Sequence, residues 1–321
     1  MIGRSDALQA LAAEPFEDPM CVTLRAVGRS YELGARPWLM GIVNASPDSF
    51  SDGGVHPTLE ARVALAAELL GAGADVIDIG GESGRTNLPP VEVDEEIRRV
   101  VPLIERVAGE LGGLVSVDTY KPAVAAAAIA AGAAIVNDVS GLRDPRLAEV
   151  CAESGAALVV MHTRAAPKQR LQDPGLYDDV LADVLGFLAE RIAVARAHGI
   201  SDDALIVDPG PDFAKTPAQT IALLRGTARL HELGRPVLMA LSRKDFIGAL
   251  TGRAPRERDA GTLAALAHCL DAGAQIFRVH DVAAAADFIA VRRALHGESE
   301  LPATAALPEE LRAQTPGDSV S

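Results

Sequence analysis

Polar and ionisable side chains recur in this sequence where short apolar runs end. The set comprises Asn44, Asp78, Asp118, Asn137 with Asp138, His162, Asp208, Ser242 with Lys244, and Arg278 with His280. A single Asp or Asn after a strand commonly caps the next helix, and we expect this role for Asp138 and Asp281. Capping does not explain eight such positions in one chain. The pattern therefore predicts one site to which all eight runs contribute.

The cations in this set have the chemistry of an anion site. Arg278 and His280 lie two apart on one run, so they share a side and could grip a phosphate together, with Arg bidentate. Lys244 stands in SRKDFIG at the start of a predicted helix, where backbone N–H groups face an anion. Arg85, in the glycine-containing loop GGESGR, is a further candidate. These residues predict a bound phosphate.

The carboxylates have a different task. Asp118 and Asp208, with Asn137, can hydrogen-bond a flat nitrogen heterocycle that is rich in N–H donors and ring acceptors. A general base is not obvious. His162 is a candidate, although a structural histidine near the site explains it equally well, and Lys215 in DPGPDFAK is expected to be a loop or surface cation.

The elements that must position these residues follow one repeating pattern. The corners GAGAD, AAGAA, ESGAA and DAGAQ close predicted helices, such as 58–71, before an apolar run begins. Eight runs, apolar on both faces, are typical of buried parallel strands. They span 38–44, 74–80, 114–118, 133–138, 156–162, 204–210, 236–242 and 274–281. Eight strand–helix units predict an α/β (β/α)₈ TIM barrel, with a doubly wound open sheet as the alternative.

Length and charge limit the possible organisation and partners. We expect 1–36 to form an N-terminal segment with a hairpin, 37–297 the barrel, and 298–321 a flexible tail. The net charge of -14 argues against nucleic acid or anionic membrane as a partner. The three cysteines lie far apart, as expected of buried side chains in a reducing compartment. With neither a signal peptide nor a membrane span evident, the sequence predicts a cytoplasmic protein.

Eight sequence blocks, in order, resemble the dihydropteroate synthase family of pterin-binding (β/α)₈ barrels. They are GIVNASPDSFSDGG, DIGGESGR, SVDTYKP, IVNDVSG, VVMH, DPGPDFAK, LSRKDFIG and IFRVHDV. The resemblance spans about residues 37–296. It implies a transferase that condenses 6-hydroxymethyl-7,8-dihydropterin pyrophosphate with 4-aminobenzoate, giving 7,8-dihydropteroate and pyrophosphate.

The resemblance also implies roles for individual residues. It assigns Asp118, Lys244, Arg278 and His280 to catalysis and Asn44 to a Mg²⁺ ion on the pyrophosphate. A mobile lid carrying Asp48, Ser49 and Phe50 would close over the aminobenzoate site. The family is commonly homodimeric. The substrate-binding set comprises Asp78, Asp118, Asn137, Asp208, Lys244, Arg85, Phe50, Arg278 and His280, with Arg85, Arg278 and His280 on phosphate oxygens.

The departures from the family pattern collect on the aminobenzoate side. Gly84, Thr86 and Asn87 replace the usual Thr or Ser, Pro and Gly of the second loop, and Asp245 stands where Ser is frequent. If Asp245 faces the site, its charge opposes a carboxylate substrate. If it is a helix cap or first-turn residue pointing away, it does not.

Three functions therefore remain open at this point. The first is an active dihydropteroate synthase, favoured because every expected pterin and phosphate ligand is present. The second is a paralogue that binds pterin pyrophosphate but is inactive or uses another acceptor. The third is a pterin-binding non-enzyme or a pterin-dependent methyltransferase. The pair Arg278 and His280 argues against a methyltransferase, which has no pyrophosphate to hold.

Overall fold

The computed structural model describes residues 22–34, 36–46, 58–83, 89–308 and 311–312. Eight parallel strands form its centre, in the order β8-β7-β6-β5-β4-β3-β10-β9. Their bounds are β3 Trp38–Asn44, β4 Val76–Gly80, β5 Leu114–Asp118, β6 Ile135–Asp138, β7 Ala157–Met161, β8 Leu205–Asp208, β9 Leu238–Ala240 and β10 Ile276–Val279. Between the two end strands, Val207 bridges to Val237, and the Val207 N–H donates to the Pro236 carbonyl over 2.9 Å. These contacts join the two end strands of the sheet, so they confirm the predicted barrel and not the alternative of an open sheet.

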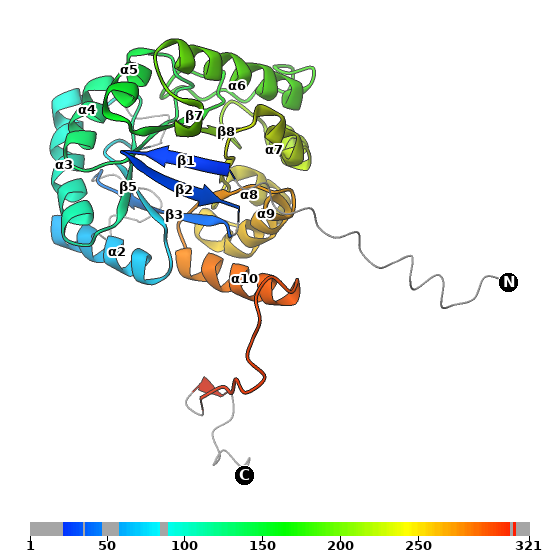
Figure 1. The fold of residues 1–321 in the computed structure, drawn as a ribbon. Coiled ribbons are helices and arrows are strands. Elements are labelled where there is room, and N and C mark those ends of the chain that lie inside the picture. Colours follow the sequence, from blue (N-terminus) through cyan, green and yellow to red (C-terminus); the bar gives the residue numbers. More distant parts are fainter. Residues whose placement is uncertain (1–21, 35, 47–57, 84–88, 309–310, 313–321) are drawn as a thin grey trace.

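Helices surround the barrel, and local sequence explains where several of them start (Figure 1). Thr58 caps α2 by accepting from the Ala61 N–H, and Thr216 with Gln219 forms a capping box on α7. At the expected corners, Gly132 and Gly273 adopt φ of 118° and 91°, which glycine allows at least cost. The helices are α2 Leu59–Gly71, α3 Val93–Gly109, α4 Pro122–Ala130, α5 Arg146–Ser154, α6 Val180–Ala197, α7 Pro217–Arg225, α8 Asp245–Thr251, α9 Asp259–Asp271 and α10 Val282–Leu295, with 3-10 turns η1 Asp202–Ala204, η2 Thr227–Leu233 and η3 Pro255–Glu257.

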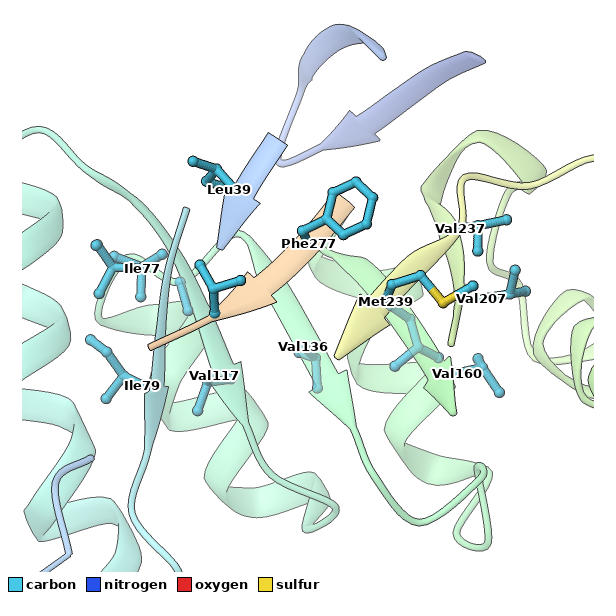
Figure 2. Close-up of a cluster of buried hydrophobic side chains, with 14 of the residues drawn as sticks. Leu39, Ile77, Ile79, Val117, Val136, Val160, Val207, Val237, Met239 and Phe277 are labelled. Carbon is cyan, nitrogen blue, oxygen red and sulfur yellow. The ribbon is translucent and has the colours of Figure 1, made fainter. Parts of the chain in front are cut away.

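Two apolar layers hold the barrel together. The outer layer lies between strands and helices and contains Ile77, Val117, Val136 and Phe277, all fully buried (Figure 2). The inner layer fills the barrel and continues into the hairpin formed by β1 Val22–Ala26 and β2 Arg29–Leu33. This predicted hairpin lies across the centre of the ring of helices (Figure 1). It closes the end of the barrel where the strands begin.

Strand alternation decides which polar residues face the interior. Successive side chains of a strand point to opposite faces, and the register aligns Gly80 with Asp118 and Asp118 with Asn137. Asn137 therefore points inward, and Asp138 points the other way. The Asp138 carboxylate accepts the N–H groups of Ser140 and Leu142, which lie in the turn after β6. The prediction that Asp138 caps the next helix was wrong, because α5 begins only at Arg146 and its N-cap residue is Pro145.

Other expectations concern the chain as a whole. Asp281 caps α10 by accepting from the Ala284 N–H, as predicted. Cys151 and Cys269 are buried and unbonded to each other, as expected, whereas Cys21 lies outside the described residues. Over the described ranges, every helix is too short or too polar to cross a membrane. The domain limits and the homodimer stay predictions.

Candidate active site

A cavity of about 790 Å³ opens where the barrel strands end. All but one of the predicted strand-end ligands that the structure describes line it, so residues up to 236 positions apart in the chain share one space. The exception, Asp78, lies beneath the floor. The predicted residues in the wall are Asn44, Asp118, Asn137, Asp208, Lys244, Arg278 and His280.

Arg278 crosses the floor of the cavity as part of an ion-pair bridge. Its Nε donates to Asp78 over 2.6 Å, and an Nη donates to Asp118 over 3.0 Å. Asp78 is fully buried and also accepts from the Asn137 amide over 3.2 Å. Asp78 therefore holds two cavity residues in place, and Arg278 is paired with carboxylates in this structure, whereas the sequence suggested only a phosphate grip.

The acidic wall of the cavity is poised to accept hydrogen bonds. Burial raises the pKa of Asp118 to about 7, against the attraction of Arg278 and with the repulsion of Asp78. Burial also raises the pKa of Asp208, although Gly210 N–H donates to its carboxylate over 2.7 Å. The Oδ1 atoms of Asp78 and Asn137 are buried without a hydrogen-bond partner among the described residues. Of these two acceptors only Asn137 lines the cavity, and its oxygen matches a polar ligand that carries N–H donors.

The basic wall is supplied by the ends of β9 and β10. Lys244 directly precedes α8, and its Nζ lies 4.4 Å from the centre of the Phe213 ring. The Nδ1 atom of His280 lies 2.8 Å from Ser242 Oγ. Burial, together with the charges of Arg278, Arg243 and Lys244, lowers the pKa of His280 to about 3. His280 is therefore a neutral hydrogen-bonding group at pH 7.

Comparison with known proteins places this cavity in a family. Residues 40–280 match the family described as "Pterin binding enzyme". Dihydropteroate synthase of Bacillus subtilis is 44% identical over 245 residues, which cover 76% of this chain and 83% of the relative. The chain belongs to the dihydropteroate synthase family. It is therefore a transferase, and the predicted family resemblance is confirmed.

Solved structures of the family agree with the fold. Dihydropteroate synthase of Xanthomonas albilineans with 4-aminobenzoic acid is 47% identical, has a TM-score of 0.79, and matches 86% of this chain and 99% of its own. The same enzyme with 7,8-dihydropteroate is 46% identical, with a TM-score of 0.75 and coverage of 85% and 98%. The (β/α)₈ barrel expected from the sequence is confirmed.

Asp245, one of the departures from the dihydropteroate synthase pattern, lies at the rim of the cavity. It is the first residue of α8, and its side chain is 61% exposed. Its carboxylate accepts from Arg258 over 3.2 Å. The Asp245 carboxylate at the rim is therefore exposed to solvent and also ion-paired with Arg258. The other departures, Gly84, Thr86 and Asn87, and the predicted ligands Arg85 and Phe50 with Asp48 and Ser49, lie outside the described residues.

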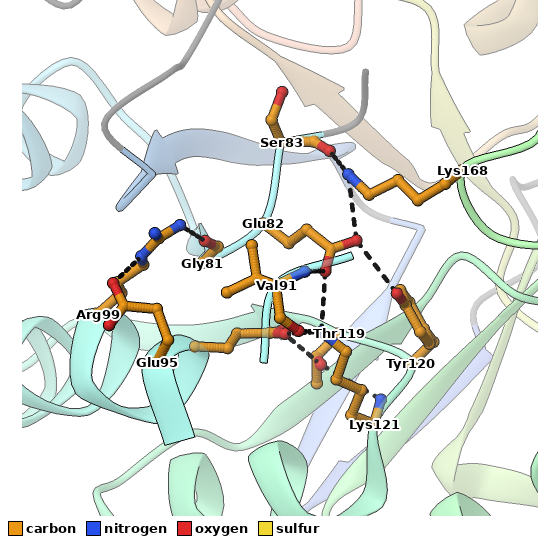
Figure 3. A network of polar contacts seen from close by, with 11 residues as sticks. Gly81, Glu82, Ser83, Val91, Glu95, Arg99, Thr119, Tyr120, Lys121 and Lys168 are labelled. Atoms are coloured by element: carbon orange, nitrogen blue, oxygen red, sulfur yellow. Dashed lines mark hydrogen bonds and ion pairs between the residues drawn. The ribbon is translucent and has the colours of Figure 1, made fainter. Parts of the chain in front are cut away.

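A polar network centred on Glu82 lies beside the cavity, and no sequence motif indicated it (Figure 3). This carboxylate accepts from Lys121 over 2.8 Å, from the Tyr120 hydroxyl over 3.1 Å and from the Val91 N–H over 2.8 Å. Lys168 lies 3.1 Å away on the loop after β7. Burial opposes ionisation of Glu82, yet these donors hold its pKa below the usual value. The network joins three loops of the cavity wall.

Lys215 lies in a loop, as expected, but it is buried rather than at the surface. His162 has the contacts of a structural histidine, one of the two roles expected for it. Lys215 is fully buried behind the cavity wall, where its Nζ lies 2.8 Å from His162 Nδ1. His162 Nε2 lies 2.9 Å from Asp183. Neither Lys215 nor His162 lines the cavity. A lysine after a strand is usually exposed, so its burial could not be deduced from the motif alone.

Proposed function

We propose that this chain condenses 6-hydroxymethyl-7,8-dihydropterin pyrophosphate with 4-aminobenzoate to give 7,8-dihydropteroate and pyrophosphate. Its family membership supports this reaction, as do the Xanthomonas albilineans structures with 4-aminobenzoic acid and with 7,8-dihydropteroate. The observation that carries the proposal is the division of the cavity. Hydrogen-bond acceptors occupy the wall formed by β5, β6 and β8, and Lys244 and His280 occupy the wall formed at β9 and β10.

In this proposal the pterin ring binds deep in the cavity. Asp118, Asn137 and Asp208 accept from its N–H and amino groups, and Lys244 donates to a ring acceptor. Asp78 takes no direct part and instead fixes Arg278 and Asn137. The pyrophosphate then lies near His280 and the cavity-facing edge of Arg278. Its negative charge would raise the pKa of His280 toward the usual value, so that the imidazole could bind a phosphate oxygen as a cation.

The chemical step exchanges one bond at the pterin methylene carbon. The C–O bond to pyrophosphate breaks first, and its electron pair leaves with the phosphate oxygen. Asp118 and Asp208 lie where their negative charges stabilise the pterin cation that remains. The amine nitrogen of 4-aminobenzoate then forms the C–N bond and releases a proton to solvent. A strong general base is not needed, because this nitrogen already carries an available lone pair.

A Mg²⁺ ion bound to the pyrophosphate fits the residues present. The described residues contain no group of three or more His, Cys, Asp or Glu side chains arranged around a metal position. Mg²⁺ does not require one, since it usually combines one or two protein oxygens with substrate phosphates and water. We propose that Asn44, on the cavity wall at the end of β3, supplies such an oxygen. The ion would neutralise charge on the leaving pyrophosphate.

The competing function is a paralogue that binds pterin pyrophosphate but uses another acceptor. Asp245 is the described departure from the family pattern whose charge could exclude a carboxylate substrate. Because its side chain is 61% exposed and paired with Arg258, we expect its repulsion to be weak. We therefore favour the synthase, and we place it in the cytoplasm, where buried thiols such as Cys151 stay reduced.

Calorimetric titration with pterin pyrophosphate in the presence of Mg²⁺ tests the site. Wild-type protein should bind, and Asp118→Ala and Lys244→Ala should each abolish measurable binding, because both side chains contact the ring in this proposal. Circular dichroism should show that both variants remain folded. Binding retained by both folded variants would refute the assignment of this cavity wall to the pterin.

A further inference from the structure

Lys215 is buried in a site built for an ammonium group. Its side chain is fully buried, and its Nζ lies 2.8 Å from His162 Nδ1, 2.9 Å from the Gly210 carbonyl and 3.1 Å from the Phe213 carbonyl. An ammonium has three protons and no acceptor, so three acceptors match its charged form. A neutral amine would have one donor too few. Burial and the charge of Lys244 lower the pKa of Lys215 to about 7, while Asp208, Asp183 and Asp212 oppose that effect, so the ammonium form predominates below neutral pH.

This arrangement also fixes the state of His162. Because Nδ1 accepts from Lys215, the proton is on Nε2 and is donated to Asp183 over 2.9 Å. Burial and the charge of Lys215 lower the pKa of His162 to about 3, so the ring is neutral. Arg164 forms an ion pair with the far side of Asp183 over 2.6 Å. The ammonium is therefore anchored to α6 through a neutral imidazole.

The segment that Lys215 holds forms part of the cavity wall. The Gly210 N–H donates to Asp208, and the Phe213 ring lies on Lys244. Asp212 and Ala214 adopt φ of 65° and 51°, a left-handed conformation that costs free energy in residues other than glycine. The contacts of Lys215 with the Gly210 and Phe213 carbonyls offset that cost. The Lys215 ammonium thus holds the backbone of segment 209–214 and also places a positive charge behind the cavity wall.

We propose that Lys215 is a positioning residue for the transfer reaction, whose ammonium holds segment 209–214 in place and keeps Asp208 ionised to accept from the pterin ring. This inference rests on the proposed function, in which Asp208 binds the ring. Lys215 itself does not reach the cavity. The charged groups that act on Asp208 are Lys215, Lys244 and Arg278. Removing Lys215 leaves two of these three cations, so the pKa of Asp208 should rise.

The first test compares two variants that loosen the same segment. Lys215→Met removes the ammonium and fills its space, whereas Tyr177→Phe removes only the hydroxyl that donates to the Ala214 carbonyl over 2.9 Å. Dissociation constants for pterin pyrophosphate would be measured from pH 5 to 9. In Lys215→Met, the loss of binding on the acid side should move to higher pH by on the order of one unit. Tyr177→Phe should weaken binding without moving the profile.

Parallel pH profiles for Lys215→Met and wild type would overturn the proposal, because a purely structural lysine changes affinity equally at every pH. Failure of wild-type protein to bind pterin pyrophosphate would instead contradict the proposed function. The two failures are therefore distinguishable.

A second measurement needs no change at Lys215, in case Lys215→Met does not fold. The chain contains only four lysines, Lys121, Lys168, Lys215 and Lys244. Labelling with isotopic lysine therefore gives four side-chain NMR signals, which single Lys→Arg variants at the other three positions assign. Coupling between two charges is reciprocal, so Asp208→Asn should lower the measured pKa of Lys215 by at least about half a unit. An unchanged value would overturn the proposal.

Discussion

Asp118 is a proposed active-site residue whose buried negative charge lowers the stability of the folded protein. Its side chain is 24% exposed at the cavity wall, and it shares Arg278 with the fully buried Asp78. Its pKa is raised to about 7, chiefly by burial. An ionised Asp118 therefore destabilises the folded protein, and in the proposed reaction its charge would stabilise the pterin cation. Residues with such a conflict are typical of active sites.

We predict that Asp118→Asn stabilises the protein at pH 8 while reducing kcat/KM by roughly a hundredfold or more. Between pH 4 and 7 the unfolded chain releases the Asp118 proton and the folded protein retains it, so wild-type stability falls as the pH rises through this window. Asp118→Asn has no ionisable group at this position, so its stability does not fall for this reason as the pH rises. Chemical denaturation should show no gain at pH 4 and a gain of about 1–4 kcal/mol at pH 8. A gain independent of pH would contradict the raised pKa.

Asp245 is the residue at which the sequence suggested the largest effect on the second substrate. Because it is exposed and paired with Arg258, its charge contributes at most ~1 kcal/mol. We predict that Asp245→Ser lowers the KM for 4-aminobenzoate by no more than about fivefold. Initial rates at varied 4-aminobenzoate measure this directly. A decrease of tenfold or more would mean that Asp245 faces the bound carboxylate.

At the scale of elements, the loops act together through Glu82. It receives donors from the segment after β5 and from the loop after β7, and it lies itself on the loop after β4 (Figure 3). Its side chain is only 8% exposed. Removing one partner of a buried ion pair leaves the other charges uncompensated, so its loss costs much more than that of a surface pair.

We predict that Glu82→Gln destabilises the protein by about 3 kcal/mol and lowers kcat/KM, because Lys121 and Lys168 lose their shared carboxylate. Glu95→Gln is the matched control, since Glu95 pairs with Arg98 and Arg99 on the more exposed face of α3. That change should cost much less than the change at Glu82, because exposed ion pairs contribute little to stability. Equal losses in thermal or urea unfolding would show that the network around Glu82 does not hold the loops.

The elements themselves were largely predictable, and the network was not. The apolar runs gave all eight barrel strands, because strands buried on both faces have a continuous apolar pattern. Observed strands are shorter at their ends, as in Leu238–Ala240 against the predicted 236–242. Glu82 and Lys168 lie 86 residues apart, and no local pattern joins them. Their contact depends on how the closed barrel places two loops.

At the scale of the whole molecule, the protonation states of the cavity residues could not be predicted from local sequence either. Strand ends predicted that Asp118, Asn137 and Asp208 share one site, because the carboxyl ends of parallel strands meet at one face, and all three line the cavity. The burial of Lys215 and the neutral state of His280 depend on neighbours from other strands and loops. A sequence pattern shows which residues can reach a site, but not how much water or charge surrounds them.

The net charge of -14 and an anionic substrate are compatible for the same reason. All four lysines lie at or directly behind the end of the barrel where the cavity opens, and Arg278 lies at its floor. The attraction of an anionic substrate by these nearby cations outweighs the repulsion from distant carboxylates, because salt screens charges over long distances. The hairpin β1–β2 closes the opposite end of the barrel, which leaves the cavity as the route to these groups.

Turnover tests the central claim most directly. Purified protein would be incubated with Mg²⁺, 6-hydroxymethyl-7,8-dihydropterin pyrophosphate and labelled 4-aminobenzoate, with Lys244→Ala as the inactive control. We predict that the wild type forms labelled 7,8-dihydropteroate and releases pyrophosphate in equal amounts, and that the control forms neither. Tight binding of pterin pyrophosphate without any labelled product would contradict the synthase and favour a paralogue with another acceptor.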